Sequence, residues 1–216
     1  MRKLFLALCV TAFTGLTAFA QVDEYKKGEF FIGYSNNQVD TGIAGGDDFS
    51  EFVDESETFH GFNVSGVFNV HRYFGIKGDI SGTYNNTDYA FSVPASPSGT
   101  GTVAFEADSS LYNFLAGVQI KDNASDARIK PFAHVLGGVG HGRVKISNLT
   151  CSTGVDCTGF GGTISETAGA AAFGGGLDLR INNRVDLRLI QVDYNPIWFD
   201  GGRTDNVRFG IGLVFK

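Results

Sequence analysis

Methionine, tryptophan and proline are scarce in this chain, which contains one Met, one Trp and four Pro among 216 residues. After residue 20 it also lacks any run of about 18 consecutive apolar residues, which excludes a membrane-spanning helix from that part of the sequence. Phenylalanine and glycine are abundant instead, with 20 and 30 copies. Many aromatic and glycine residues beside few helix formers favour an all-β protein with crowded strand faces.

Residues 1–20 have the composition of a secretory signal peptide. Arg2 and Lys3 give a basic start, the following residues are mostly apolar, and positions 18–20 form a small-x-small cleavage site. We expect the mature chain to form one domain over residues 21–216. Loss of Arg2 and Lys3 changes the formal charge from −6 to −8, since no acidic residue precedes Asp23.

Cysteine is also rare, with three copies, and Cys9 lies inside the expected signal peptide. The other two, Cys151 and Cys157, lie in a segment rich in Gly, Thr and Ser. In an exported chain this spacing predicts a local disulfide. Two cysteines without a His or carboxylate pattern beside them do not make a zinc site, so we expect no metal.

Residues 171–194 alternate between apolar and polar side chains in two strands joined by a tight turn. The first strand places Leu177 and Leu179 on one face and Asp178 and Arg180 on the other. Because successive strand residues point to opposite faces of a sheet, one face is apolar and the other carries charge and glycine. A soluble sandwich alternates in the same way, so this hairpin alone does not decide the fold class.

The number and spacing of such segments decide it. Strands are predicted at 28–35, 58–70, 73–84, 109–121, 129–146, in both halves of this hairpin, and at 205–216. Long loops are expected at 36–57, 85–107, 147–165 and 195–204, with short turns between them. An up-and-down meander places all the long loops at one end and both termini at the other. Since roughly 9 to 11 tilted residues cross a bilayer, the sequence predicts an all-β fold: an eight-stranded antiparallel up-and-down transmembrane β-barrel.

The interior of an eight-stranded barrel is narrow, so we expect the small and polar row inside and the bulky apolar row against lipid. The expected outward residues include Phe74, Ile76, Ile80, Phe114, Val118, Phe209 and Ile211. The polar residues expected in the lumen are Lys77, Asp79, Gln119, Asp178, Arg180 and Arg208. Because buried charges must be paired, we expect a salt-bridged plug rather than a conduction path, with at least one acid–base contact between strands.

The seventh predicted strand contains a conflict of parity. On a regular strand, Asp186 and Arg188 would face one side and Gln191 and Asp193 the other. Both pairs face the lumen only if a bulge lies near Ile190. Otherwise Arg188 lies at the periplasmic rim and faces outward, and the sequence favours Gln191 and Asp193 inside in either case.

Four stretches carry a family resemblance: Gly174-Gly175-Gly176-Leu177-Asp178, the turn at Asn182-Asn183, Gln191-Val192-Asp193-Tyr194, and the closing strand 207–215. Through them the chain resembles the outer-membrane β-barrel domain family, the eight-stranded OmpA/OmpX-type barrels, over residues 29–216. The resemblance implies a bacterial outer-membrane location and contact with outer-membrane lipid. It also implies recognition of the C-terminal strand by the barrel-assembly machinery. Family members usually end on an aromatic residue, whereas here Lys216 follows Phe215.

An enzyme is one alternative, since some small barrels modify lipids with a Ser, a His and a carboxylate at the outer rim. The chain has four histidines, His60, His71, His134 and His141. His141 lies near the outward end of its strand, with Ser147 beyond it, but neither a His-x-Ser pair nor a nucleophile elbow accompanies it. The sequence therefore predicts no catalytic residues.

The remaining features point to the surface. The first long loop carries Asp47, Asp48, Glu51, Asp54, Glu55 and Glu57, but their spacing does not match an EF-hand and favours a solvated acidic loop over a cation site. Aromatic residues near strand ends fit a membrane girdle, namely Tyr34, Phe59, Tyr84, Tyr112 and Tyr194. No phosphate loop, basic nucleic-acid patch or cofactor motif is visible.

We therefore expect no cofactor and no nucleic-acid partner. The predicted role is structural or surface-interacting, through long extracellular loops and an unidentified surface ligand. A small transporter or pore, or a lipid-binding barrel, is the alternative.

Overall fold

The structure is a computed structural model that describes residues 25–40, 56–94, 100–152, 154–155, 157–158, 161–200 and 202–216. Within these residues it contains ten strands: β1 (Gly28–Asp40), β2 (Ser56–Asn69), β3 (Phe74–Pro94), β4 (Thr100–Lys121), β5 (Ile129–Cys151), β6 (Gly162–Arg180), β7 (Val185–Tyr194), β8 (Ile197–Phe199), β9 (Gly202–Thr204) and β10 (Asn206–Phe215). No helix in the described part of the chain is long and apolar enough to cross a membrane.

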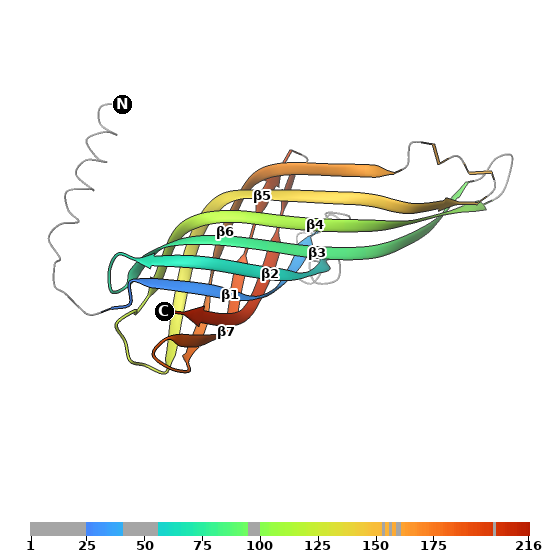
Figure 1. Cartoon of the computed structure of the whole chain (residues 1–216). Helices are drawn as coiled ribbons and strands as arrows, with labels where there is room; N and C mark the ends of the chain where they lie inside the picture. Colours follow the sequence, from blue (N-terminus) through green and yellow to red (C-terminus); the bar gives the residue numbers. More distant parts are fainter. Residues whose placement is uncertain are drawn as a thin grey trace, which may run out of the picture.

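Eight of these strands form a closed ring (Figure 1). Neighbours along the chain pair antiparallel from β1 to β7, and β10 lies between β7 and β1, with Phe30 opposite Phe215. Closure gives each barrel strand a partner on both sides, so no backbone edge faces the bilayer. The predicted eight-stranded up-and-down barrel is therefore confirmed.

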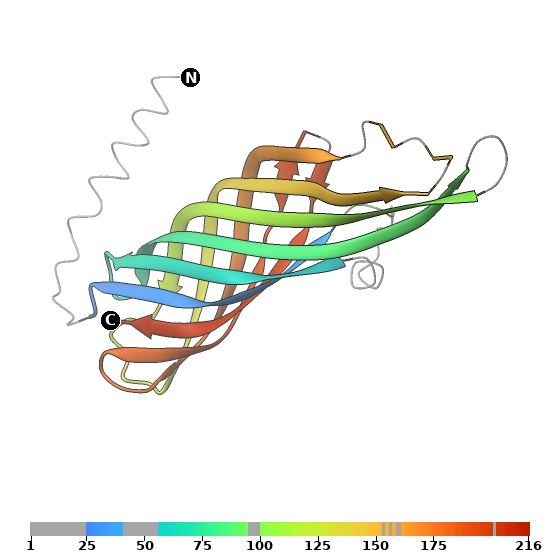
Figure 2. The ribbon, with the colours of Figure 1, turned by 45° about the vertical axis from the view of Figure 1, so that its right-hand side comes forward.

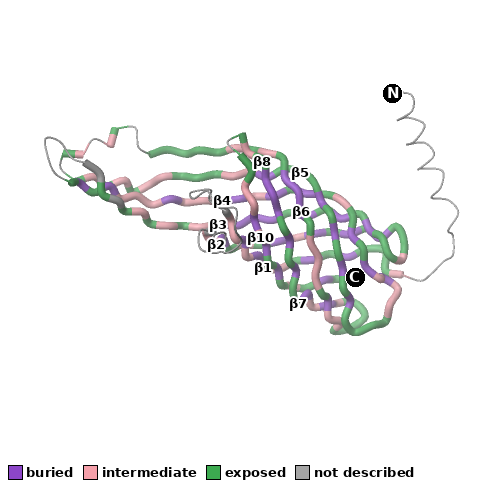
Figure 3. Tube along the Cα trace, turned by 180° about the vertical axis from the view of Figure 1, so that it is seen from behind, coloured by how far each residue is buried: buried purple, intermediate pink, exposed green. Residues whose placement is uncertain are grey.

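The outward row of side chains is the predicted one. Phe74, Ile76, Ile80, Phe114, Val118, Phe209 and Ile211 are all exposed on the outside of the barrel. Their strand neighbours of the opposite parity are buried, apart from Gly117 and Gly212, which are partly exposed, and the colours alternate along the barrel strands (Figure 3). This prediction is confirmed, and the apolar face is available to lipid.

Four neighbouring strands are much longer than the rest. The strands β3, β4, β5 and β6 have 21, 22, 23 and 19 residues, whereas β7 and β10 have 10 each. Their extra length projects as a curved sheet beyond the end of the barrel that is remote from the C-terminus (Figure 2). We call residues 85–94, 100–109, 143–151 and 162–168 the sheet extension.

One predicted loop is therefore wrong and another is shorter than expected. The segment 85–107 is largely strand, because β3 and β4 stay paired up to Pro94 and Thr100. In the predicted loop 147–165, residues 147–151 belong to β5 and residues 162–165 to β6. Proline is excluded from the middle of a sheet, not from the last residue of a strand, and Pro94 is that last residue. The hydrogen bonds between paired strands continue beyond the membrane-spanning part of the barrel, because they do not depend on lipid.

The predicted fourth loop also contains regular structure. The short strands β8 and β9 form a hairpin between β7 and β10, and Ile197 and Trp198 pair with Ala170 and Gly169 of β6. The hairpin thus pairs with β6 beyond Phe173, where the pairing of β6 with β7 ends.

The bulge alternative for the seventh strand is the one found. Leu177 of β6 pairs with Ile190 of β7, whereas the next residue of β6, Asp178, pairs with Arg188. One extra residue of β7 is therefore accommodated at Leu189–Ile190. Both bulge residues are exposed, at 40% and 43%. The extra residue lets Arg188 point inward together with the residues that follow the bulge.

A disulfide joins Cys151 and Cys157 at the tip of the sheet extension, with a Cα–Cα distance of 6.6 Å. This prediction is confirmed. The expected signal peptide with Cys9, and the acidic residues of the first loop other than Glu57, lie outside the described residues.

Candidate functional site

The inner face of the barrel carries a set of almost fully buried polar side chains. They are Glu29, Lys77, Asp79, Gln119, Lys121, His134, Asp178, Arg188, Gln191, Asp193 and Arg208, and seven strands contribute to them. We call this set the lumen network. Each member has the parity opposite to the exposed apolar row of its strand, so its side chain points inward.

Arg208 links strands that are far apart in the sequence. Its Nη1 donates to Asp79 Oδ1 at 2.9 Å and to Ser81 Oγ at 2.8 Å, while Nη2 donates to Asp193 Oδ2 at 2.6 Å. Asp79 also accepts from Asn63 Nδ2 at 2.9 Å. Because β10 pairs with β1 at the barrel seam, these bonds tie the closing strand to β3 through the interior.

A second group forms around Asp178. Its Oδ1 accepts from Arg188 Nε at 2.8 Å, and its Oδ2 accepts from Lys121 Nζ at 2.8 Å. Lys121 also donates to Glu29 Oε1 at 2.8 Å. The guanidinium carbon of Arg188 lies 4.0 Å from the ring centroid of Phe132, a cation–π geometry. Each charge in this group therefore has a buried partner.

Lys77 and His134 connect the two groups. Lys77 Nζ lies 3.2 Å from His134 Nδ1 and 3.7 Å from Asp79 Oδ2, and His134 Nε2 lies 2.9 Å from Asp193 Oδ1. Gln119 is buried in the same interior, and its amide atoms have no hydrogen-bond partner among the described residues.

Arg180 does not join the lumen network, so its predicted place in the lumen is wrong. It lies at the open end of the barrel, where Nη1 donates to Asp126 Oδ1 and Nη2 to Asn183 Oδ1, each at 2.6 Å. The physical reason is position along the strand. Arg180 is the last residue of β6, and two residues beyond Asp178 the chain has reached the rim and its turns.

Sequence reasoning missed three members of the network. Glu29, Lys121 and His134 were not among the predicted lumen residues, although all three are buried. The signal was present in the parity of each strand. His134, for example, alternates with Val135, which is 52% exposed, so the histidine faces inward and is not an interfacial residue.

The remote end of the interior is apolar. Leu111, Leu115, Leu136, Ala170, Ala172 and Ile197 form one buried cluster, and Val39, Ala168 and Phe199 pack against it. Ile197 belongs to β8 and is fully buried, so the hairpin supplies part of this cluster. We call it the apolar plug. The expectation of a uniformly small and polar inner row is wrong here.

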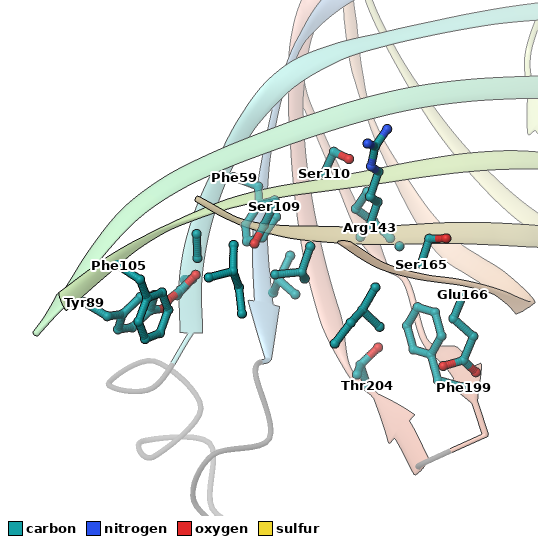
Figure 4. Close-up of a pocket in the computed structure, with 18 residues that line it drawn as sticks. Phe59, Tyr89, Phe105, Ser109, Ser110, Arg143, Ser165, Glu166, Phe199 and Thr204 are labelled. Carbon is teal, nitrogen blue, oxygen red and sulfur yellow. The ribbon is translucent and has the colours of Figure 1, made fainter. Parts of the chain in front are cut away.

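A cavity of about 450 Å³ lies beyond the apolar plug, on the concave side of the sheet extension (Figure 4). Aromatic and aliphatic side chains dominate its lining, including Phe59, Phe105, Ile164 and Phe199. Two carboxylates, from Glu57 and Glu166, and the guanidinium group of Arg143 also line it.

Both carboxylates of this cavity are held in place. The Tyr89 hydroxyl donates to Glu57 Oε1, and this bond raises the pKa of Tyr89 to about 12. The backbone N–H of Asp200, in the hairpin, donates to Glu166 Oε1 at 2.6 Å. The cavity is thus apolar with a few oriented polar groups, the composition typical of small-ligand pockets.

Polar aromatic residues mark the rim between barrel and extension. The Tyr112 hydroxyl donates to that of Tyr84 at 3.0 Å, the Tyr34 hydroxyl contacts His60 Nδ1, and Tyr194 donates to Asp205. Phe59 was expected in this girdle but is buried inside, because it shares the inward parity of Asn63.

The described residues contain no group of three or more His, Cys, Asp or Glu side chains placed to hold a metal ion. Inside the barrel the charged groups form ion pairs, and the cavity beyond it combines an apolar lining with Glu57, Glu166 and Arg143.

Comparisons with known proteins agree with this architecture. No curated protein matches the chain. The attachment invasion locus protein Ail of Yersinia pestis, in complex with the heparin analogue sucrose octasulfate, has a TM-score of 0.51 at 20% identity, covering 88% of this chain and 100% of that chain. A second Ail structure has a TM-score of 0.50 at 18% identity, covering 87% and 97%. Neisserial surface protein A has a TM-score of 0.48 at 11% identity, covering 88% and 97%.

The family model described as the outer membrane protein beta-barrel domain matches residues 5–215. The chain therefore belongs to the outer-membrane β-barrel family, and its location is the bacterial outer membrane, in contact with lipid.

Proposed function

We propose that this protein is a surface-interaction barrel whose lumen is closed and whose sheet extension recognises a partner outside the cell. The observation that carries the proposal is the separation of two regions. Buried ion pairs and the apolar plug fill the barrel, whereas the apolar cavity lies in the extension beyond it.

Two layers of side chains support a closed lumen. The lumen network pairs its acids and bases across strands, and the apolar plug covers it at the extension end. A hydrated ion crossing this interior must separate charge pairs and then enter an apolar layer. Both steps are unfavourable, because buried charges and polar groups need partners.

The cavity supports recognition by the extension. Its volume of about 450 Å³ lies in the range of small-ligand pockets, roughly 300–1,000 Å³. The apolar lining and the carboxylates of Glu57 and Glu166 favour a ligand that presents an apolar group beside a cation or hydrogen-bond donor. Arg143 also lines the cavity, and Ail, which shares the fold, was solved with a heparin analogue, so sulfated glycans also belong among the first ligands to test.

We propose no catalytic activity. The Nδ1 atom of His141 lies 2.7 Å from Thr167 Oγ1 at the rim. Among the described residues no carboxylate lies within ion-pair distance of His141. The pair therefore lacks the acid that orients the imidazole in hydrolytic triads.

Conductance across planar bilayers, together with a lipid-modification assay on the refolded chain, tests the closed lumen and the absence of catalysis. We expect no steady single-channel steps and no lipid product. Large steady steps mean that the barrel is a small pore. Lipid cleavage that disappears in His141→Ala means that it is an enzyme.

Binding to cells that display the protein tests recognition by the extension. Sucrose octasulfate and panels of host glycans and matrix proteins are the probes. We expect Phe105→Ser and Phe199→Ser to weaken any binding found, because both side chains line the cavity. Ala90→Ser, at an exposed position of the extension that does not line the cavity, is the matched control and should bind like the parent.

We also propose that the closing strand is the segment recognised by the barrel-assembly machinery. Phe215 is 42% exposed on the lipid side of β10, as an aromatic signal requires. Phe215→Ala should lower the amount of barrel inserted in cells while leaving refolding of purified chain into lipid nearly unchanged. Equal insertion of both chains contradicts this assignment.

A further inference from the structure

We propose that the periplasmic mouth of the barrel binds a compact multivalent anion of the phosphate type. The site is a cavity of about 530 Å³ at the end of the barrel opposite the sheet extension. The segment before β1, the turn between β4 and β5, the turn after β6 and the end of β10 all contribute to its wall.

The charge of the lining is strongly unbalanced. Five cationic side chains line the cavity, Lys26, Lys27, Lys130, Arg180 and Lys216, against one acidic side chain, Asp126. A cavity with this excess of one sign concentrates counter-ions of the other sign.

Two described acids near this mouth, Asp126 and Asp186, are already engaged. Asp126 accepts from Arg180 Nη1 at 2.6 Å. Asp186 Oδ1, which does not line the cavity, lies 2.6 Å from Lys216 Nζ. No described acidic side chain lies within ion-pair distance of Lys26, Lys27 or Lys130. Among the described residues, Lys26 and Lys130 therefore have no ion-pair partner, and Lys27 is held only by the hydroxyl group and ring of Tyr25.

Lys130 distinguishes this cavity from a solvated basic rim. The residue is only 6% exposed and lines the cavity, yet no hydrogen bond or ion pair holds it among the described residues. Its cross-strand neighbour is Asp178, whose oxygens are bound by Arg188 and Lys121. The stem of Lys130 is buried while its ammonium group reaches the cavity without an ion pair from a described residue, and an anion in the cavity supplies that pair.

The orientation of Lys130 favours a soluble anion over a lipid headgroup. Its neighbours Ile129 and Pro131 are exposed on the outside, whereas Lys130 faces the interior. The cavity therefore opens along the barrel axis toward the periplasm. Lysine ammonium groups bind phosphate as point charges, so a cluster of them suits a compact anion with two or more charges.

Inorganic pyrophosphate is the probe, titrated into the refolded full chain in phosphatidylcholine nanodiscs and followed by amide and lysine NMR shifts. We expect one saturable site with shifts centred on Lys130 and the turn at residues 123–126. Lys130→Gln should weaken binding by about tenfold to a hundredfold, the range expected for one charge-assisted contact. Pyrophosphate should also raise the unfolding midpoint of the parent but not of this variant.

Arg128→Gln is the matched control, because Arg128 is an exposed cation of the same β4–β5 turn that does not line the cavity. It should bind within about twofold of the parent. Equal weakening by both variants, or no saturable binding, overturns the proposal. If Lys130→Gln does not fold, Lys26→Gln with Lys27→Gln decides the question, since both lysines are exposed and precede β1.

Nanodiscs containing phosphatidylglycerol separate the two sources of phosphate. If the shifts at Lys130 appear with this lipid alone and pyrophosphate adds nothing, the site binds a singly charged lipid headgroup and the proposal of a multivalent anion fails. If they appear only with pyrophosphate, the ligand is soluble.

Discussion

At the scale of single residues, this barrel depends on buried ions whose partners come from distant strands. Arg208 and Asp79 are 129 residues apart in the sequence and bond directly. Such pairs add little net stability relative to an apolar interior, but removal of one partner leaves the other charge buried and alone, at a cost of about 3–5 kcal/mol.

Asp178→Ala should therefore destabilise the barrel by about 3–5 kcal/mol. It leaves Arg188 buried without its carboxylate partner, and it removes one of the two carboxylates that bind Lys121. The control is Asp126→Ala, which removes a carboxylate that is 93% exposed and should change the stability by about 0–1 kcal/mol. Unfolding titrations in lipid compare the two, with Asp47→Ala as a loop control. If all three chains unfold at the same denaturant concentration, the lumen network does not hold the barrel together.

Glu106, on the sheet extension, gives a prediction for pH. Its carboxylate accepts hydrogen bonds from Asn86, at 2.6 Å, and from Asn148, and these bonds lower its pKa. A depressed folded-state pKa means that the contribution to stability is present above the unfolded value, about 4.3 for Glu, and is lost as the pH falls through the folded value.

A carbon-13 NMR titration of the Glu106 carboxyl group measures this shift. We expect a midpoint below the ordinary glutamate value in the parent, and a return toward that value in the Asn86→Ala, Asn148→Ala double variant. Identical midpoints in the two chains contradict a role for these two amides.

At the scale of elements, the bulge in β7 keeps two polar runs on the inner face. With Leu189 and Ile190 both outside, Arg188 and Gln191 both point inward. Deletion of Ile190 should give a regular strand in which the polar residues on both sides still face the lumen, so we expect this chain to fold.

Deletion of Val192 should have the opposite effect, because either Gln191 or Asp193 must then face lipid, where an unpaired polar side chain is unfavourable. Heat-modifiable electrophoretic mobility distinguishes the folded from the unfolded barrel in both chains. If the two deletions are equally tolerated, or equally damaging, side-chain parity is not what the bulge preserves.

The disulfide belongs to the tip of the extension and not to the barrel. Cys151 and Cys157 are six residues apart, so the bond closes a short loop and restricts little of the unfolded chain. Replacing both by Ser should leave the unfolding midpoint of the barrel nearly unchanged while increasing amide exchange at the end of β5. A large drop in the midpoint shows that the tip supports the barrel.

At the scale of the whole molecule, the alternation of side chains and loop lengths predicted the barrel, its outward row and most of its buried ions. The alternation could not predict the apolar plug, because Leu115 and Gln119 both face inward by parity. The neighbouring sequence does not indicate which inward residue contacts the β8–β9 hairpin. It could not predict the sheet extension either. Pro94 and its neighbours are typical of loops, and strand pairing beyond the bilayer depends on contacts between distant segments.

The extension and the barrel should therefore be separable. Up to Tyr84, β3 pairs with both β2 and β4, and beyond it the pairing of the described residues continues only with β4. Asn85 lies opposite Ser109, so residues 86–108 can be replaced by Asn-Gly, which favours a tight hairpin turn. The shortened chain keeps the lumen network and Leu111 of the apolar plug but loses Phe105 and Tyr89 from the cavity.

We expect the shortened chain to fold with nearly the parent unfolding midpoint and to remain non-conducting, because the ring of eight paired strands and its filled interior are untouched. We expect it to lose binding at the cell surface, because the cavity loses one wall. Denaturant titration, bilayer conductance and cell-surface binding test these three outcomes separately. A chain that fails to fold would show that the extension is part of the folding unit. A chain that folds and still binds would place recognition outside the cavity.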